Sequence, residues 1–99
     1  MIAVVILNWN GAEMLRRFLP SVVEHSHPLG EVIVADNGST DNSLEILQQE
    51  FPEVHTLVLD HNYGFAEGYN EAFRRLEIIA PQRYEYYLLL NSDVRVTAD

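Results

Sequence analysis

The sequence contains neither cysteine nor lysine, and both absences limit what the protein can be. Without cysteine there is no disulfide and no thiolate metal ligand, although any redox compartment suits such a chain. All six basic residues are arginines, against fifteen acidic residues, so the formal net charge is −9. Nucleic-acid binding needs clustered positive charge, and this composition therefore argues against nucleic acid as a partner.

Long apolar runs are absent as well. None approaches the roughly 20 residues that span a bilayer, and no basic region precedes the short apolar stretch at the N-terminus, as it would in a signal peptide. The cytoplasm is therefore the default expectation for localisation. With 99 residues, 47% of them hydrophobic, the sequence predicts a single globular domain over residues 1–99.

Four short apolar runs predict β-strands. They are Ile2–Leu7, Val32–Ala35, Val54–Leu59 and Tyr86–Leu90. Each run is nearly continuous, which is typical of parallel strands covered on both faces. Apolar residues at helical spacing fill the three intervals, around Leu15–Val23, Leu44–Phe51 and Tyr69–Leu76. The alternating order predicts an α/β fold: a Rossmann-like, three-layer α/β/α arrangement with a mostly parallel sheet, whose ligands bind outside the carboxyl ends of the strands.

The first strand ends in "NWNG", Asn8 to Gly11. A dinucleotide-binding turn needs G-x-G-x-x-G, which is missing, and the phosphate loop G-x-x-x-x-G-K-[ST] is excluded because there is no lysine. Two amides and an indole could instead frame a flat heterocycle by hydrogen bonding and stacking. The competing interpretation is that Trp9 fills the core while the asparagines cap the next helix.

The second strand ends in "ADNGSTD", Ala35 to Asp41. Gly38 permits a sharp turn, and Ser39 and Asp41 are interpreted as helix caps rather than ligand contacts. Asp36 precedes the cap and could accept a hydrogen bond from a base or a ribose. A phosphate-accepting receiver domain also has an aspartate here, but it needs an acidic pair after the first strand and a lysine, and this sequence has neither.

The third strand is followed by "DHNYGFAEGYN", Asp60 to Asn70. One interpretation is an ordinary loop in which Asp60 or Asn62 turns the chain. The other is that the next helix begins beside the ligand, where its dipole favours anions. The four histidines do not have the spacing of a metal site and are interpreted as surface or core residues.

The fourth strand ends in Asn91-Ser92-Asp93. Mg²⁺ and Mn²⁺ prefer oxygen ligands, and often use one or two carboxylates together with substrate phosphates. Asp93, with neutral oxygens from Asn91 and Ser92, fits such a weak site that the substrate completes.

Together, in this order and spacing, the four strand ends resemble the donor-binding half of family 2 glycosyltransferases with the GT-A fold. The matching segments are "VVILNWNG" (Val4–Gly11), "VIVADNGSTDNS" (Val32–Ser43), "NYGFAEGYNEA" (Asn62–Ala72) and "YLLLNSDVRV" (Tyr87–Val96). The resemblance covers nearly the whole chain. It looks closest to bacterial enzymes that build surface polysaccharides, including rhamnosyltransferase-like members, whose metal motif often reads L-N-x-D-V.

The resemblance implies a role for seven residues. Those that would bind the nucleotide sugar or its metal are Leu7, Asn8, Trp9, Asp36, Asn91, Ser92 and Asp93. Asp36 would accept the imide N–H of a uracil or thymine ring, and Asp93 would bind Mg²⁺ or Mn²⁺ at the family's Asp-x-Asp position. Asn91 departs from the aspartate of many relatives, so the metal would bind weakly without the nucleotide.

The implied function is transfer of a sugar from a UDP- or dTDP-linked donor to a glycan or lipid-linked acceptor in bacterial cell-surface polysaccharide synthesis. Such a transfer would be inverting and metal-dependent, and it could take place at the inner face of the cell membrane. The general base would lie downstream, in an acceptor-binding half that these 99 residues lack, so the isolated chain is expected to be inactive. The alternative is a non-catalytic, Rossmann-like fragment that binds nucleotide or self-associates through an exposed sheet edge.

Overall fold

The computed structural model describes residues 2–26 and 30–91. Strands and helices alternate along the chain, as the apolar pattern predicts. The strands are β1 (Ile2–Asn8), β2 (Gly30–Asp36), β3 (His55–Val58) and β4 (Tyr86–Asn91), and the helices are α1 (Ala12–Ser26), α2 (Ser43–Glu50) and α3 (Phe65–Ile79).

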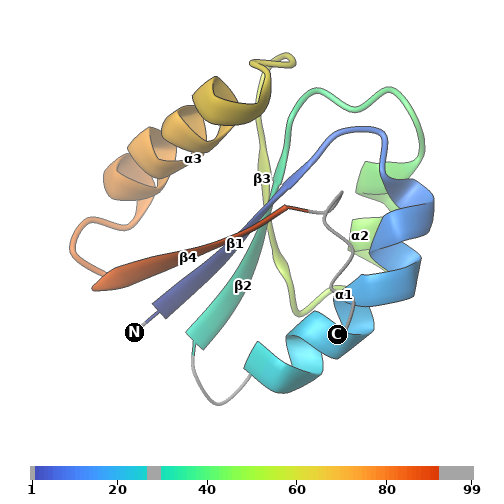
Figure 1. Cartoon of the computed structure of the whole chain (residues 1–99), viewed down its shortest axis with the longest axis horizontal. Helices are drawn as coiled ribbons and strands as arrows, with labels where there is room; N and C mark the ends of the chain where they lie inside the picture. The colour runs from blue at the N-terminus through green and yellow to red at the C-terminus, as the bar shows by residue number, and fades with distance from the viewer. Residues whose placement is uncertain (1, 27–29, 92–99) are drawn as a thin grey trace, which may run out of the picture.

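The four strands form one sheet in the order β3-β2-β1-β4, and every pairing between neighbours is parallel. Helices α1 and α2 lie on one face of this sheet and α3 on the other (Figure 1). The predicted three-layer α/β/α fold is therefore confirmed. Because all strands run the same way, their carboxyl ends meet at one edge of the sheet.

Two apolar clusters hold the three layers together. On one face, Val4 and Ile6 of β1 belong to the cluster formed with α1 and α2. On the other face, Val5 and Leu7 pack in the cluster formed with α3. Residues 3–8 of β1 and 32–36 of β2 are all buried, which explains their continuous apolar sequence.

The outer strands differ from the prediction that all four strands are covered on both faces. β3 and β4 lie at the two edges of the sheet, and Val58, Leu88 and Tyr86 are 53%, 49% and 68% exposed. The helices pack over the two central strands, so the side chains of the edge strands remain partly in solvent. An apolar run alone does not distinguish a central strand from an edge strand.

The helices begin and end close to their predicted places. Pro81 follows α3 by two residues, consistent with a residue that cannot continue a helix. Within residues 2–26 and 30–91, no helix combines the length and apolar character needed to cross a lipid bilayer.

Candidate functional site

The parallel register brings several of the predicted site residues to the carboxyl edge of the sheet. Asn8 at the end of β1 pairs with Asp36 at the end of β2, and Leu7 pairs with Asn91 at the end of β4. The backbone N–H of Asn37 donates to Asn8 O at 2.7 Å, which holds β1 and β2 together just beyond this pair. Ser92 and Asp93, the other two residues of the predicted metal motif, lie outside the described residues.

Asp36 is buried, 1% exposed, and its carboxylate folds the turn that follows β2. Oδ1 accepts hydrogen bonds from Asn8 Nδ2 at 3.1 Å and from Ser39 Oγ at 2.6 Å, and Oδ2 accepts one from the Ser39 N–H at 2.9 Å. The chain can turn back in this way because Gly38 adopts φ = 77°. Asp36 therefore has a structural role that the sequence does not reveal, and its contact with a nucleobase stays a prediction.

Asn8 is completely buried, yet its side chain is only half satisfied. Its Nδ2 donates to Asp36, whereas Oδ1 has no hydrogen-bond partner among the described residues. A buried acceptor without a donor is costly and uncommon in folded proteins. A donor from a ligand or from water would satisfy it, so Asn8 is a candidate component of a site at this edge.

Trp9 lies on the surface, with 54% of its area exposed. The interpretation that Trp9 fills the core is therefore wrong, and an indole is available for stacking directly after β1. Its neighbour Asn10 adopts φ = 49° and accepts hydrogen bonds from the backbone N–H groups of Thr40 at 2.7 Å and Asp41 at 3.2 Å. Asn10 thus joins the turns that follow β1 and β2 instead of capping α1.

The two residues interpreted as helix caps have different roles. Ser39 bonds to Asp36, and its Oγ also accepts the Asn10 N–H at 2.9 Å, so it is not a cap. Asp41 accepts hydrogen bonds from the N–H of Ala12, which opens α1, at 3.2 Å and of Ser43, which opens α2, at 2.9 Å. Burial acts to raise the pKa of Asp41, but hydrogen bonds from Ser43 and Ala12 outweigh it and the pKa lies below its usual value.

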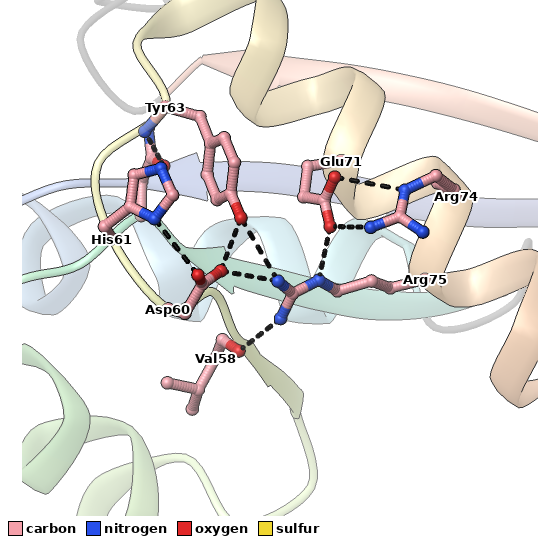
Figure 2. A network of polar contacts seen from close by, with 8 residues as sticks. Val58, Asp60, His61, Tyr63, Glu71, Arg74 and Arg75 are labelled. Atoms are coloured by element: carbon pink, nitrogen blue, oxygen red, sulfur yellow. Dashed lines mark hydrogen bonds and ion pairs between the residues drawn. The ribbon is translucent and has the colours of Figure 1, made fainter.

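The loop between β3 and α3 contains an ordinary turn formed by Asn62 and, before it, a network of polar contacts around Asp60. Asn62 Oδ1 accepts the Gly64 N–H at 2.8 Å, which turns the chain into α3. Asp60 accepts hydrogen bonds from Tyr63 OH at 2.5 Å and Arg75 Nη2 at 2.6 Å, in the network that Figure 2 shows. The hydrogen bond from the Tyr63 hydroxyl is the main reason that the pKa of Asp60 lies well below its usual range; Arg75 and His61 lower it further.

Asn37 is a site residue that the sequence analysis missed. Its side chain is buried, and its Nδ2 donates to Asn62 Oδ1 at 3.1 Å and to Gly64 O at 3.0 Å, while its Oδ1 accepts the Tyr63 N–H at 2.9 Å. These bonds fasten the end of β2 to the β3–α3 loop. No local pattern could have indicated them, because the partners lie more than twenty residues further along the chain.

A half-open cavity of about 340 Å³ lies elsewhere. Its lining includes His55 at the start of β3, Ile79 at the end of α3, and Arg83 and Tyr84 before β4. These residues surround the amino ends of the strands, so this cavity is separate from the predicted donor site.

Comparison with known proteins identifies the family. The family model described as "Glycosyl transferase family 2" matches residues 3–99. The chain belongs to this family. The resemblance to family 2 glycosyltransferases drawn from the four strand ends is therefore confirmed.

Curated relatives include a polysaccharide synthase and a rhamnosyltransferase. A poly-β-1,6-N-acetyl-D-glucosamine synthase of Staphylococcus epidermidis is 30% identical over 99% of this chain and 23% of its own length. The N-acetylglucosaminyl-diphospho-decaprenol L-rhamnosyltransferase of Mycobacterium tuberculosis is 29% identical over 93% of this chain and 32% of its own length. The chain thus spans about a quarter to a third of these relatives.

Solved structures show the same fold. S. aureus TarS 1-349 in complex with UDP-GlcNAc aligns with a TM-score of 0.71 at 24% identity, over 93% of this chain and 26% of that one. The mannosyltransferase PcManGT from Pyrobaculum calidifontis, in complex with GDP-Man and Mn²⁺, aligns with a TM-score of 0.61 at 23% identity, over 75% of this chain and 24% of that one. At these identities the likeness establishes the GT-A type of fold for this family 2 domain.

The predicted metal motif at the end of β4 stays a prediction, because two of its three residues lie outside the described ones. In the described ranges 2–26 and 30–91, no three His, Cys, Asp or Glu side chains are arranged so that they could hold a metal ion. His25, His55 and His61 are exposed, as expected for surface residues. The backbone of Asn91 reaches the carboxyl edge beside β1, so the predicted metal motif begins at the edge that carries Asn8 and Asp36.

Proposed function

We propose that this chain is the donor-binding part of an inverting, metal-dependent glycosyltransferase that uses a UDP- or dTDP-linked sugar. The observation that carries the proposal is the register that brings Asn8, Asp36 and the backbone of Asn91 to one edge, with the exposed Trp9 after β1. The ligands in the structures of TarS, UDP-GlcNAc, and PcManGT, GDP-Man, support a nucleotide-sugar donor.

The nucleoside would lie at the ends of β1 and β2. Trp9 stacks on the base, and Leu7 and Asn8 line the base and ribose. Asp36 accepts the imide N–H through Oδ2, which accepts a single hydrogen bond within the described residues and so keeps a lone pair for a ligand. Asn8 Oδ1, a buried acceptor without a partner in the part of the chain that the structure describes, provides a second partner for a donor group of the nucleoside or its water.

The diphosphate would lie at the end of β4. Asn91, Ser92 and Asp93 would hold Mg²⁺ or Mn²⁺, which when bound neutralises the charge that develops on the leaving diphosphate. A cation also suits a chain whose formal net charge is −9 and which would otherwise repel a phosphate ester. The Mn²⁺ in the PcManGT complex supports a divalent metal.

In the reaction, the acceptor oxygen bonds to the anomeric carbon as the bond to the phosphate oxygen breaks. The acceptor hydroxyl gives its proton to a general base, which in the family is an Asp or Glu downstream of the metal motif. The acceptor would be a glycan or a lipid-linked glycan of the bacterial cell surface, and the enzyme would work in the cytoplasm or at the inner face of the membrane. The names of the two curated relatives support this class of acceptor.

Isothermal titration of UDP and of dTDP into the chain, with and without Mn²⁺, tests the proposal. Wild-type protein should bind one of the nucleotides only when Mn²⁺ is present, and Asp93→Ala should abolish that binding because it removes the one anionic metal ligand of the motif. Asp99→Ala, the same substitution near the C-terminus, is the matched control and should bind like wild type. Binding that ignores both Mn²⁺ and Asp93→Ala would contradict the metal assignment.

A non-catalytic, self-associating fragment is the second candidate, favoured by the exposed apolar side chains of β4. Hydrolysis of the nucleotide sugar distinguishes a donor-binding glycosyltransferase part from a structural fragment. A competent donor site should slowly release UDP or dTDP from a nucleotide sugar, whereas a purely structural fragment should release none. Measuring free nucleotide over hours, with Asp93→Ala as the blank, separates them.

A further inference from the structure

We propose that Asn37 is a positioning residue, which fixes the β3–α3 loop (residues 59–64) and the first turn of α3 beside the donor site. The inference rests on the proposed donor site. Asn37 would fix the position of the first turn of α3 and would not itself contact the nucleotide.

The side-chain amide and the backbone N–H of Asn37 are all used within the fold. Both protons of Nδ2 go to acceptors of the loop, Asn62 Oδ1 and Gly64 O, at 3.1 and 3.0 Å. Its Oδ1 accepts the Tyr63 N–H at 2.9 Å, and its own N–H donates to Asn8 O at 2.7 Å. The residue is 2% exposed, so water does not compete for these bonds.

The first turn of α3 extends past the carboxyl edge of the sheet. Phe65 lies on the same helix stripe as Tyr69 and Leu76, which are 5% and 6% exposed, but Phe65 is 60% exposed. Tyr69 OH donates to Leu90 O at 2.7 Å, which places the second turn of α3 against the end of β4. Phe65 and the backbone N–H groups of the first turn therefore lie at the edge where the donor is proposed to bind, and the N-cap residue of this turn, Gly64, makes no side-chain capping bond.

The loop is held on its outer side by a different kind of interaction. Arg75 is paired with Glu71 and also donates to three groups of the loop and its flank (Figure 2). These acceptors are Asp60 Oδ1, Tyr63 OH and Val58 O. The groups are mostly on the surface, where ion pairs contribute little and are screened by salt. The buried Asn37 bonds are therefore the part of the restraint that fixes the loop position.

An aspartate in place of Asn37 tests this, because it has the same shape but no donor at neutral pH. Its carboxylate would face Asn62 Oδ1 and Gly64 O, which are both acceptors. We expect Asn37→Asp to bind the nucleotide about tenfold more weakly than wild type at pH 7.5. Without the buried hydrogen bonds, a smaller fraction of molecules holds the loop in the position that binds the nucleotide. The readout is quenching of Trp9, the single tryptophan of the chain, by UDP or dTDP with Mn²⁺.

The matched control is Asn42→Asp. Asn42 is the exposed N-cap residue of α2 and makes no side-chain capping bond, so the substitution adds the same charge five residues further along the chain without changing a bond to the loop. It should keep wild-type affinity. Asp60→Asn, which alters the outer network alone, should also keep it.

Acidification provides a readout that a general loss of stability would not give. The carboxylate introduced by Asn37→Asp becomes protonated as the pH falls to about 5 and regains one donor, so the affinity ratio of variant to wild type should recover. Other titratable groups on the elements around this position belong to both proteins and cancel in that ratio. They are Asp36, Asp60, His61, Tyr63 and Glu67.

Three outcomes of the binding measurements decide whether Asn37 positions the loop. Weaker binding that recovers in acid supports the positioning role. Equal affinity of wild type and Asn37→Asp overturns it, and an absence of binding by wild type itself overturns the proposed donor site instead. If Asn37→Asp does not fold, Asn62→Ala, which removes one acceptor of the Asn37 amide, takes its place and should weaken binding to an intermediate extent; unchanged affinity would then overturn the inference.

Discussion

At the residue scale, two glycines with positive φ angles differ in what surrounds them. Gly38 has φ = 77°, and a Cβ built on it would lie 2.7 Å from the carbonyl carbon of His61 and 2.8 Å from Asn62 N. Gly64 has φ = 82°, but a Cβ there would meet nothing within 4 Å. Backbone strain should therefore affect alanine at either position, whereas a clash should affect alanine at Gly38 alone.

Gly38→Ala should lower the free energy of unfolding by at least about 2 kcal/mol, because strain and a backbone clash add. Gly64→Ala, the control for strain, should cost about 1 kcal/mol. Urea unfolding followed by circular dichroism measures both. Equal losses would show that the β3–α3 loop yields to the added methyl group.

Residue roles at the site were only partly predictable from the sequence. The exposure of Trp9 and the cap formed by Asp41 agree with one of the interpretations that the sequence allows. The bonds that Ser39 and Asn37 make depend on the left-handed turn at Gly38 and on a loop distant in sequence, and no local pattern encodes either. The turn residues in the sequence indicate which edge of the sheet carries the predicted site. The hydrogen-bond partners of the side chains at that edge depend on tertiary contacts.

At the element scale, Glu31 joins three segments at the amino end of the sheet. It lies in β2 and accepts hydrogen bonds from Arg83 at 2.9 Å, from Tyr84 OH at 2.6 Å and from His55 of β3 at 3.1 Å. The Arg83 guanidinium, then the Tyr84 hydroxyl, lowers the pKa of Glu31 from 4.5 to about 2. A carboxylate with a depressed pKa stabilises the fold above its unfolded pKa and loses that effect as the pH falls.

Glu31→Gln should therefore lower the free energy of unfolding at pH 6 by about 1 kcal/mol, the scale of a part-buried ion pair. The difference from wild type should shrink as the pH falls from 4.5 towards 2, where Glu31 protonates in the folded state. Urea midpoints over this range measure it. Exposed Glu53, changed to Gln, controls for the lost charge, and a gap that stays constant with pH would contradict the assignment to Glu31.

Elements were the most predictable level of the structure. The apolar pattern places all four strands and three helices, and strand bounds differ by one or two residues. β3 begins one residue later and ends one residue earlier than predicted, because buried Val54 and Leu59 flank it rather than pair within it. Which strands lie at the edges could not be predicted, since that depends on the order in which strands pair.

At the scale of the whole molecule, the two sheet edges are unequally protected. β4 is six residues long, has no charged residue and exposes Leu88 and Leu89 by 49% and 47%. β3 has only four residues, and one of its carbonyl groups, Val58 O, accepts a hydrogen bond from Arg75 Nη1 at 3.2 Å. Long apolar edges are prone to pair with another chain, so self-association should use β4.

Light scattering after size exclusion should accordingly show dimers of the isolated chain that increase with concentration. Leu88→Lys places a charge on the β4 edge and should give monomers, with little change in thermal stability because the residue is half-exposed. Val58→Lys is the matched control on β3 and should dimerise like wild type. A wild-type chain that is monomeric at every concentration would exclude the proposed edge.

The position of β1 has a consequence for biosynthesis. β1 precedes the other three strands in the chain, yet it lies between β2 and β4, so that Ile2 pairs with Gly30 on one side and with Tyr86 on the other. During translation the nascent chain can join β1 to β2 early, but the second side of β1 stays unpaired until β4 leaves the ribosome. β1 is thus the strand with the longest stretch of chain before its last neighbour, and an apolar strand edge that stays unpaired during synthesis is prone to aggregation.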